Sequence, residues 1–159
     1  MTVCIAALCD DRHAIVLAAD RKISTWLSEA EFATSKIRPV HPDWWALMAA
    51  NDVSPVFTIL DRLEEELSGK KPDASEMADI LGDAFKDERA RRAETSVLSP
   101  YRMTMAEFIR NGRNQLGDAI FERFQLQIAV SALGCQLIVA GFDPSGVGHV
   151  MSIADPGQV

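Results

Sequence analysis

The sequence predicts an α+β protein, because segments typical of strands occupy both ends of the chain and segments typical of helices occupy its middle. Apolar runs of strand length occur before residue 51 and again after residue 135. Between them, apolar residues recur at helical spacing. With 159 residues, of which 48% are hydrophobic and 25% are charged, the chain has the composition of a soluble globular protein, and we expect a single domain over residues 1–159.

The N-terminal segment predicts a β-hairpin. The apolar runs TVCIAAL at residues 2–8 and AIVLAA at residues 14–19 are separated by the polar turn CDDRH at residues 9–13. Both strands are apolar on both faces, so we expect other layers to cover the hairpin on each side. The second run ends at Asp20, a carboxylate that must find a partner or stay near solvent.

After an irregular excursion at residues 24–39, the sequence predicts a strand that leads directly into a helix. The run WWALMAA at residues 44–50 predicts the strand. Ser54 as N-cap and Pro55 at the first helical position predict the start of the helix, and Gly69 predicts its end.

Two further helical segments begin with capping-box patterns, DASE at residues 73–76 and TMAE at residues 104–107. We expect the first to reach about Arg92, and the second to be weakened or split at Gly112 and Gly117.

Residues 136–141 and 149–153 predict two final strands joined by a turn. A turn signal follows the last strand, which would normally be covered by a further element, so we expect the fold to be incomplete at its C-terminal end.

The composition also excludes several classes of partner. A formal net charge of −7 argues against a nucleic-acid groove or an anionic membrane surface. The one basic cluster, at Arg89, Arg91 and Arg92, lies among acidic residues, and we interpret it as the solvated face of a helix. The three cysteines and the absence of a signal sequence predict a reducing, cytoplasmic location. The three histidines lack metal-ligand spacing, so we expect neither a metal nor a cofactor.

Thr2 is the leading candidate nucleophile. A residue as small as threonine allows methionine aminopeptidase to remove Met1, which leaves a hydroxyl and a free α-amine on one residue. An α-amine titrates near pH ~8, so part of it is unprotonated at neutral pH and can take the hydroxyl proton. Taken alone, Thr2 is more simply interpreted as an ordinary N-terminal residue. Cys4 would be an alternative nucleophile if Val3 were also removed, but a buried strand cysteine is the simpler interpretation.

Three other positions could support chemistry at Thr2. The Lys36 ammonium would favour the deprotonated hydroxyl and amine, and Asp20 would hold Lys36 in its charged form. The Ala50 N–H, where the strand meets the helix, is a candidate oxyanion donor. The alternative interpretations are a hairpin-end turn residue or a structural salt bridge for Asp20 and a surface position for Lys36.

The order of Thr2, LAADR at residues 17–21, KI at residues 36–37 and AA at residues 49–50 resembles the proteasome β-subunit family of the N-terminal nucleophile hydrolase superfamily. The sixteen-residue separation of Asp20 and Lys36 fits this family, and IVAGFD at residues 138–143 is similar to part of its later strand pair. The stretch at residues 95–131 resembles only a divergent bacterial or archaeal branch.

This resemblance implies a four-layer αββα sandwich and a threonine-type hydrolase that cleaves peptide or amide bonds through an acyl-enzyme ester. It implies the roles given above for Thr2, Asp20, Lys36 and Ala50. It further implies that Ser24 aligns the substrate and that the substrate pocket is bordered by Ile23, Thr34 and Met48. It also implies a cytoplasmic homo-oligomeric ring with inward-facing active sites and, as an open question, an unfoldase partner.

Three features depart from the family pattern. The hairpin is about two residues longer, and Ala50 replaces the oxyanion glycine, which is acceptable where its φ is negative. The chain also ends before the family's Gly-Ser-Gly and Asp-x-x-Ser elements, which support the nucleophile's amine. Two alternatives therefore stay open: a non-catalytic structural subunit of a proteasome-like ring, and a small-molecule amidase of the same superfamily.

Overall fold

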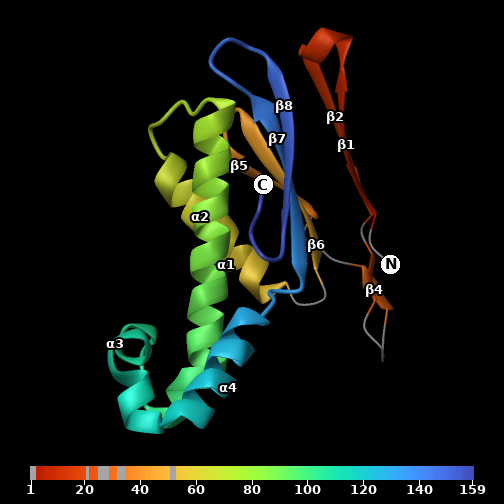
Figure 1. Ribbon diagram of the computed structural model, residues 1–159. Helices are drawn as coiled ribbons and strands as arrows, with labels where there is room; N and C mark the ends of the chain where they lie inside the picture. The colour runs from red at the N-terminus through yellow and green to blue at the C-terminus, as the bar shows by residue number, and fades with distance from the viewer. Residues whose placement is uncertain (1–2, 21, 25–28, 32–34, 51–52) are drawn as a thin grey trace. The chain divides into compact units, whose positions relative to one another are not determined.

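The computed structural model describes residues 3–20, 22–24, 29–31, 35–50 and 53–159 and has the mixed α+β architecture that the sequence predicts (Figure 1). All strand pairs in this part of the chain are antiparallel. The chain divides into two compact units, one formed by Met1–Phe85 and Gly134–Val159, the other by Lys86–Leu133.

A four-stranded antiparallel sheet is the centre of the first unit. Its strands, in spatial order, are β5 (Ile37–His41), β6 (Trp44–Ala50), β7 (Cys135–Phe142) and β8 (Gly148–Ala154). β6 pairs with β7 from Trp44 opposite Gly141 to Ala50 opposite Cys135, so strands from the two ends of the chain lie side by side. Neighbours on both sides and a wholly apolar sequence explain why no residue of β6 is exposed.

Helix α1 (Ser54–Leu67) contacts β5, β6 and β7. The apolar stripe that predicts this helix is buried along its whole length, at Val56, Ile59, Leu60, Leu63 and Leu67. Each such side chain contributes roughly 1.5–3 kcal/mol when it is fully removed from water. The helix begins one residue earlier than predicted, with Val53 rather than Ser54 at the N-cap.

The predicted N-terminal hairpin is present as β1 (Cys4–Cys9) and β2 (Ala14–Ala19), joined by a 3-10 turn at Asp10–Arg12. β1 contacts β6, β7 and β8, and Figure 1 shows the hairpin and α1 on opposite sides of the four-stranded sheet. The expectation that both hairpin faces are covered is wrong. Ile5 and Val16, on the face turned away from that sheet, are 52% and 54% exposed, because no described element packs over them.

A second, shorter hairpin follows, formed by β3 (Lys22–Ser24) and β4 (Glu29–Glu31). The sequence predicts only an irregular excursion in this region. β5 likewise begins within the excursion predicted for residues 24–39, because its backbone pairs with the strongly apolar β6.

The second unit is helical and has a small core of its own. It contains the end of α2 (Ala74–Ala93), a π-helical turn at Glu94–Leu98, α3 (Met105–Leu116) and α4 (Asp118–Ala129). Gly117, at φ 76°, separates α3 from α4, as the sequence allows. The core consists of Leu98, Met103, Phe108, Phe121 and Phe124.

Candidate active site

The start of β1 and the segments that follow β2 and precede β5 meet at the carboxylate of Asp20. Asp20 Oδ1 accepts a hydrogen bond from Lys36 Nζ at 2.9 Å and another from the backbone N–H of Val3 at 2.9 Å. The Asp20 N–H in turn donates to the Val3 carbonyl at 3.0 Å. A single carboxylate oxygen therefore links the lysine to the residue directly after Thr2.

Lys36 is buried, with a side chain only 6% exposed, whereas the Asp20 side chain is 27% exposed. An ammonium in such a position requires an anionic partner, because burial of an unpaired charge is costly. The structure therefore contains the ion pair that the sequence predicts. The alternative interpretation of Lys36 as a surface lysine is wrong.

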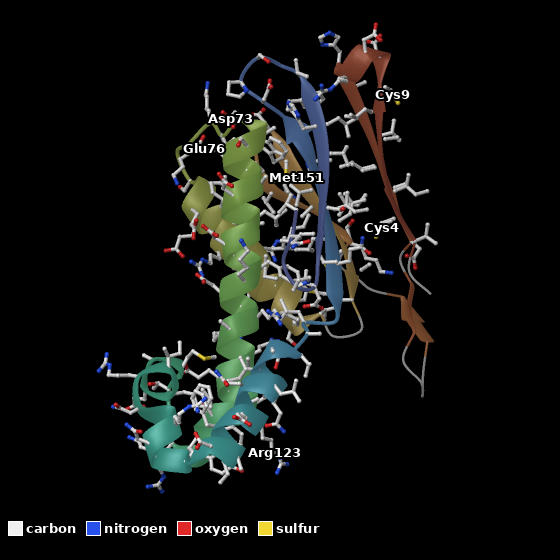
Figure 2. All side chains as sticks on the ribbon, in the orientation of Figure 1. Cys4, Cys9, Asp73, Glu76, Arg123 and Met151 are labelled. Atoms are coloured by element: carbon white, nitrogen blue, oxygen red, sulfur yellow. The ribbon has the colours of Figure 1, made fainter. Side chains whose placement is uncertain are left out.

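Met48 connects this ion pair to the four-stranded sheet. Its N–H donates to the Lys36 carbonyl at 3.1 Å, and its carbonyl accepts from Cys4 Sγ at 3.3 Å. Figure 2 shows Cys4 on the hairpin strand that begins at this point. Burial raises the pKa of the Cys4 thiol, against the opposing effect of Lys36, so the thiol stays protonated. This supports a structural role for Cys4 over a nucleophilic one.

The other predicted site residues are described to different extents. Thr2 and Thr34 lie outside the described residues. The backbone of Ile23 and Ser24 forms part of β3, but their side chains lie outside the described part of the chain. The described residue that bonds the lysine–aspartate pair is Val3, which follows Thr2 in the sequence.

Ala50 is the last residue of β6 and pairs with Cys135 of β7. Positive φ angles at non-glycine residues of the described chain occur at Asp10, Asp11, Arg12 and Arg102. Ala50 therefore meets the condition under which alanine can replace glycine at this position. The role of the Ala50 N–H as a hydrogen-bond donor to the oxyanion stays a prediction.

A second polar cluster, which the sequence does not predict, joins the tip of the first hairpin to the β7–β8 turn. Arg12 donates from Nε to the Gly148 carbonyl at 3.0 Å, and its Nη2 lies 2.9 Å from His149 Nδ1. His149 Nε2 lies 2.9 Å from Asp143 Oδ2. Because arginine can only donate, His149 accepts at Nδ1, and the proton we assign to Nε2 is donated to Asp143.

Asp143 also holds its own turn together. Its Oδ1 accepts from the Ser145 hydroxyl at 2.6 Å, from the Ser145 N–H at 2.9 Å and from the Val147 N–H at 3.0 Å. These bonds and the one from His149 hold the pKa of Asp143 well below its usual range. Ser145 bonds Asp143 rather than His149, so the three side chains are not arranged as a Ser-His-Asp triad.

Comparison with protein-family models and with curated proteins finds no match for this chain. None of the helices in the described part of the chain combines the length and apolar character needed to cross a bilayer. Within the described ranges, no group of three or more His, Cys, Asp or Glu side chains could hold a metal ion.

Proposed function

We propose that the protein is a threonine-type hydrolase of peptide or amide bonds, with Thr2 as the N-terminal nucleophile after removal of Met1. The observation that carries this proposal is the Asp20 carboxylate, which bonds both the Lys36 ammonium and the Val3 N–H at 2.9 Å. A buried positive charge is thereby held beside the residue that follows Thr2. Such a charge favours the deprotonated forms of the threonine hydroxyl and α-amine.

The reaction divides into acylation and hydrolysis. The α-amine of Thr2 takes the hydroxyl proton while Oγ attacks the substrate carbonyl carbon. The C–N bond then breaks, the leaving nitrogen receives that proton, and an ester forms on Thr2. Water deprotonated by the same amine attacks the ester carbon, which releases the acid and restores the hydroxyl. The Ala50 N–H is the proposed donor to the oxyanion.

We also propose that the chain is a proteasome β-subunit-like protein with a four-layer αββα sandwich, active as a homo-oligomeric ring in the cytoplasm. The arrangement of α1, the four-stranded sheet and the β1–β2 hairpin supports the order of three of these layers. The apolar side chains on the outward face of the hairpin, such as Ile5 and Val16, support a further covering element. An unfoldase partner would belong to the same proposal.

Covalent labelling of the purified protein tests the nucleophile. A peptide epoxyketone reacts with both the hydroxyl and the α-amine of an N-terminal threonine, so intact mass should show loss of Met1 and one adduct. Thr2→Ser is the matched variant that keeps both groups and should also label, whereas Thr2→Ala should not. Retention of Met1, or an adduct on Thr2→Ala, would overturn the proposal.

Variants of Lys36 test whether its charge acts on Thr2. Lys36→Met should slow labelling by roughly 100-fold, whereas Lys36→Arg should retain part of the rate because it keeps the charge. The pH at which the labelling rate is half-maximal should rise in Lys36→Met, because the positive charge that favours the free amine is gone. An unchanged pH profile would show that Lys36 is only structural.

Sedimentation velocity of the unlabelled protein at micromolar concentration tests the ring. We expect a discrete assembly much larger than 17.5 kDa. A monomer at all concentrations would contradict the ring. A ring in which neither the wild-type protein nor Thr2→Ser reacts with the epoxyketone would identify a non-catalytic subunit.

A further inference from the structure

The helical unit contains a hollow of about 490 Å³ that involves none of the proposed hydrolase residues. Its walls come from the end of α2, the π-helical turn that follows, and the segment after α4. The lining residues are Arg89, Arg91, Arg92, Ala93, Thr95, Ser96, Ser131, Ala132 and Leu133. This volume lies within the range of small-molecule sites.

The charge of this hollow is opposite to that of the whole protein, which carries a formal charge of −7. Three of its lining residues are arginines, and none of the described residues that line it is acidic. Arg91 is 58% exposed, as the interpretation of a solvated helix face predicts, but Arg89 and Arg92 are half-buried and all three line the hollow. The chain after α4 folds back beside them and converts the helix face into the wall of a concave site.

Arg89 is held by neutral groups. Its Nε donates to the Ser131 carbonyl and its Nη2 to the Ala129 carbonyl, both at 2.7 Å. These carbonyls lie at the C-terminal end of α4, where the helix dipole favours a cation. They fix the guanidinium in place but cannot neutralise it, so Arg89 retains its full positive charge.

Arg91 and Arg92 share one carboxylate. Arg91 binds Glu88 through two hydrogen bonds of 2.7 Å, and Arg92 Nε donates to Glu88 Oε1 at 2.8 Å. Burial alone would raise the pKa of Glu88, but the bonds from the two arginines outweigh it and hold the pKa below its usual value. Counted over Arg89, Arg91, Arg92 and Glu88 alone, three guanidinium groups and one carboxylate give an excess of two positive charges.

Part of the lining comes from a rare element that directly follows α2. Thr95 and Ser96 belong to the π-helical turn Glu94–Leu98, and such turns inside helices are found frequently at functional sites. The Thr95 hydroxyl donates to the Arg91 carbonyl, and the Ser96 hydroxyl donates to the Ala93 carbonyl. The Ser131 hydroxyl donates to the Gln127 carbonyl. Their oxygen lone pairs are thereby available to accept hydrogen bonds from a ligand's hydroxyl groups.

We propose that this hollow binds a small phosphate monoester. A phosphate monoester carries nearly two negative charges at neutral pH, which matches the excess charge of the cluster, whereas a monocarboxylate would neutralise only half of it. Guanidinium groups that are already fixed lose little side-chain entropy when they bind a phosphoryl group. The volume leaves room for a hydroxylated group of sugar size beside the phosphate, where the hydroxyl oxygens of the wall would meet it.

Isothermal titration calorimetry on the full chain tests this proposal, with ribose 5-phosphate, inorganic phosphate, ribose and citrate as probes. We expect saturable binding of ribose 5-phosphate, weaker binding of phosphate and no binding of ribose. Arg89→Gln should weaken ribose 5-phosphate binding by at least roughly ten-fold, because a charge-assisted bond is lost. Ala132→Glu, which adds a carboxylate at an exposed lining position, should do the same without removing any existing bond.

Arg123→Gln is the matched control. Arg123 is an exposed arginine of α4 outside the hollow, and its substitution lowers the net charge by the same one unit as the two test variants (Figure 2). We expect it to bind ribose 5-phosphate as the wild-type protein does. Equal weakening by all three variants would reveal non-specific attraction and overturn the proposal. So would a lack of saturable binding, or tighter binding of citrate than of ribose 5-phosphate.

Discussion

Lys36 Nζ donates to Asp20 Oδ1 at 2.9 Å, although the two residues lie on different segments and the lysine side chain is almost completely buried. The same oxygen accepts the Val3 N–H, so the pair also fixes the first described residue of the chain. We therefore expect the ion pair to affect two quantities that can be measured separately: the free energy of unfolding and the reactivity proposed for Thr2.

Asp20→Asn should lower the free energy of unfolding by roughly 2–4 kcal/mol, because it leaves the Lys36 ammonium buried without its anionic partner. In the double variant with Lys36→Met, the loss should be smaller than the sum of the two single losses. Urea unfolding of the four proteins measures this coupling.

The exposed pair of Arg113 and Asp118 is the control, since its side chains are 57% and 73% exposed. Asp118→Asn should change the free energy of unfolding by less than about 1 kcal/mol. Additive effects of Asp20→Asn and Lys36→Met would mean that the buried pair does not stabilise the fold as a unit.

The β7–β8 turn should lose stability in acid through Asp143. The pKa of this carboxyl is held below its usual value by the Ser145 hydroxyl, His149 and backbone N–H groups, so its protonation costs more in the folded state than in the unfolded state. Its contribution is fully present above the unfolded pKa of about 4 and is lost as the pH falls below that value. The difference in free energy of unfolding between the wild type and Asp143→Asn should therefore become smaller as the pH falls.

Urea unfolding between pH 2.5 and pH 7 measures that difference. Ser145→Ala removes only the hydroxyl bond and leaves the backbone bonds, so its effect should be intermediate. If the difference between the wild type and Asp143→Asn stays constant over this range, the low pKa of Asp143 does not contribute to stability.

Local sequence patterns predict the strands and helix ends that are determined by residues close together in the sequence. The strands at Trp44–Ala50 and Ala14–Ala19 have the predicted bounds, because each is an uninterrupted apolar run between polar turn residues. The split at Gly117 and the capping box of Thr104 and Glu107 also have local causes, namely the backbone freedom of glycine and hydrogen bonds between residues three positions apart.

What the sequence could not predict depends on segments far apart in the chain. Arg12 and His149 are 137 residues apart, and no local pattern links them. The arginines around Arg89 have acidic neighbours in sequence, which favours a solvated face, but the segment after α4, near Ser131, comes to lie beside Arg89 only in the folded chain. Similarly, the apolar pattern of the first hairpin predicts burial of both faces, whereas in the described chain only one face packs on the four-stranded sheet.

Helix α3 should depend on its N-terminal capping box. The Thr104 hydroxyl accepts from the Glu107 N–H at 3.2 Å, and the Thr104 N–H donates to the Glu107 carboxylate at 2.9 Å. Thr104→Ala should lower the free energy of unfolding by about 1 kcal/mol, as measured in urea. Thr104→Ser keeps the hydroxyl and should retain most of that stability. Equal losses in the two variants would show that the methyl group, and not the cap, is what matters.

Gly141 should be the least replaceable glycine of the four-stranded sheet. A Cβ atom at this position would collide with the Asp43 carbonyl and with the ring of Trp44, which is fully buried. Neither can move easily, because Asp43 O accepts the Phe142 N–H and Trp44 pairs with Gly141 itself. Gly141→Ala should therefore cost roughly 1–3 kcal/mol or more, and the fluorescence spectrum of the folded protein should change as Trp44 shifts.

Gly69→Ala separates this collision from the backbone preference of glycine. Gly69 has a φ of +73°, and a Cβ atom added there would meet no neighbouring atom within 4 Å. Alanine at this position should therefore cost only about 1 kcal/mol and leave the tryptophan spectrum unchanged. Urea unfolding and fluorescence of both variants distinguish the two effects. If Gly141→Ala were no more destabilising than Gly69→Ala, the close approach of β7 to Trp44 would not be a constraint on the sheet.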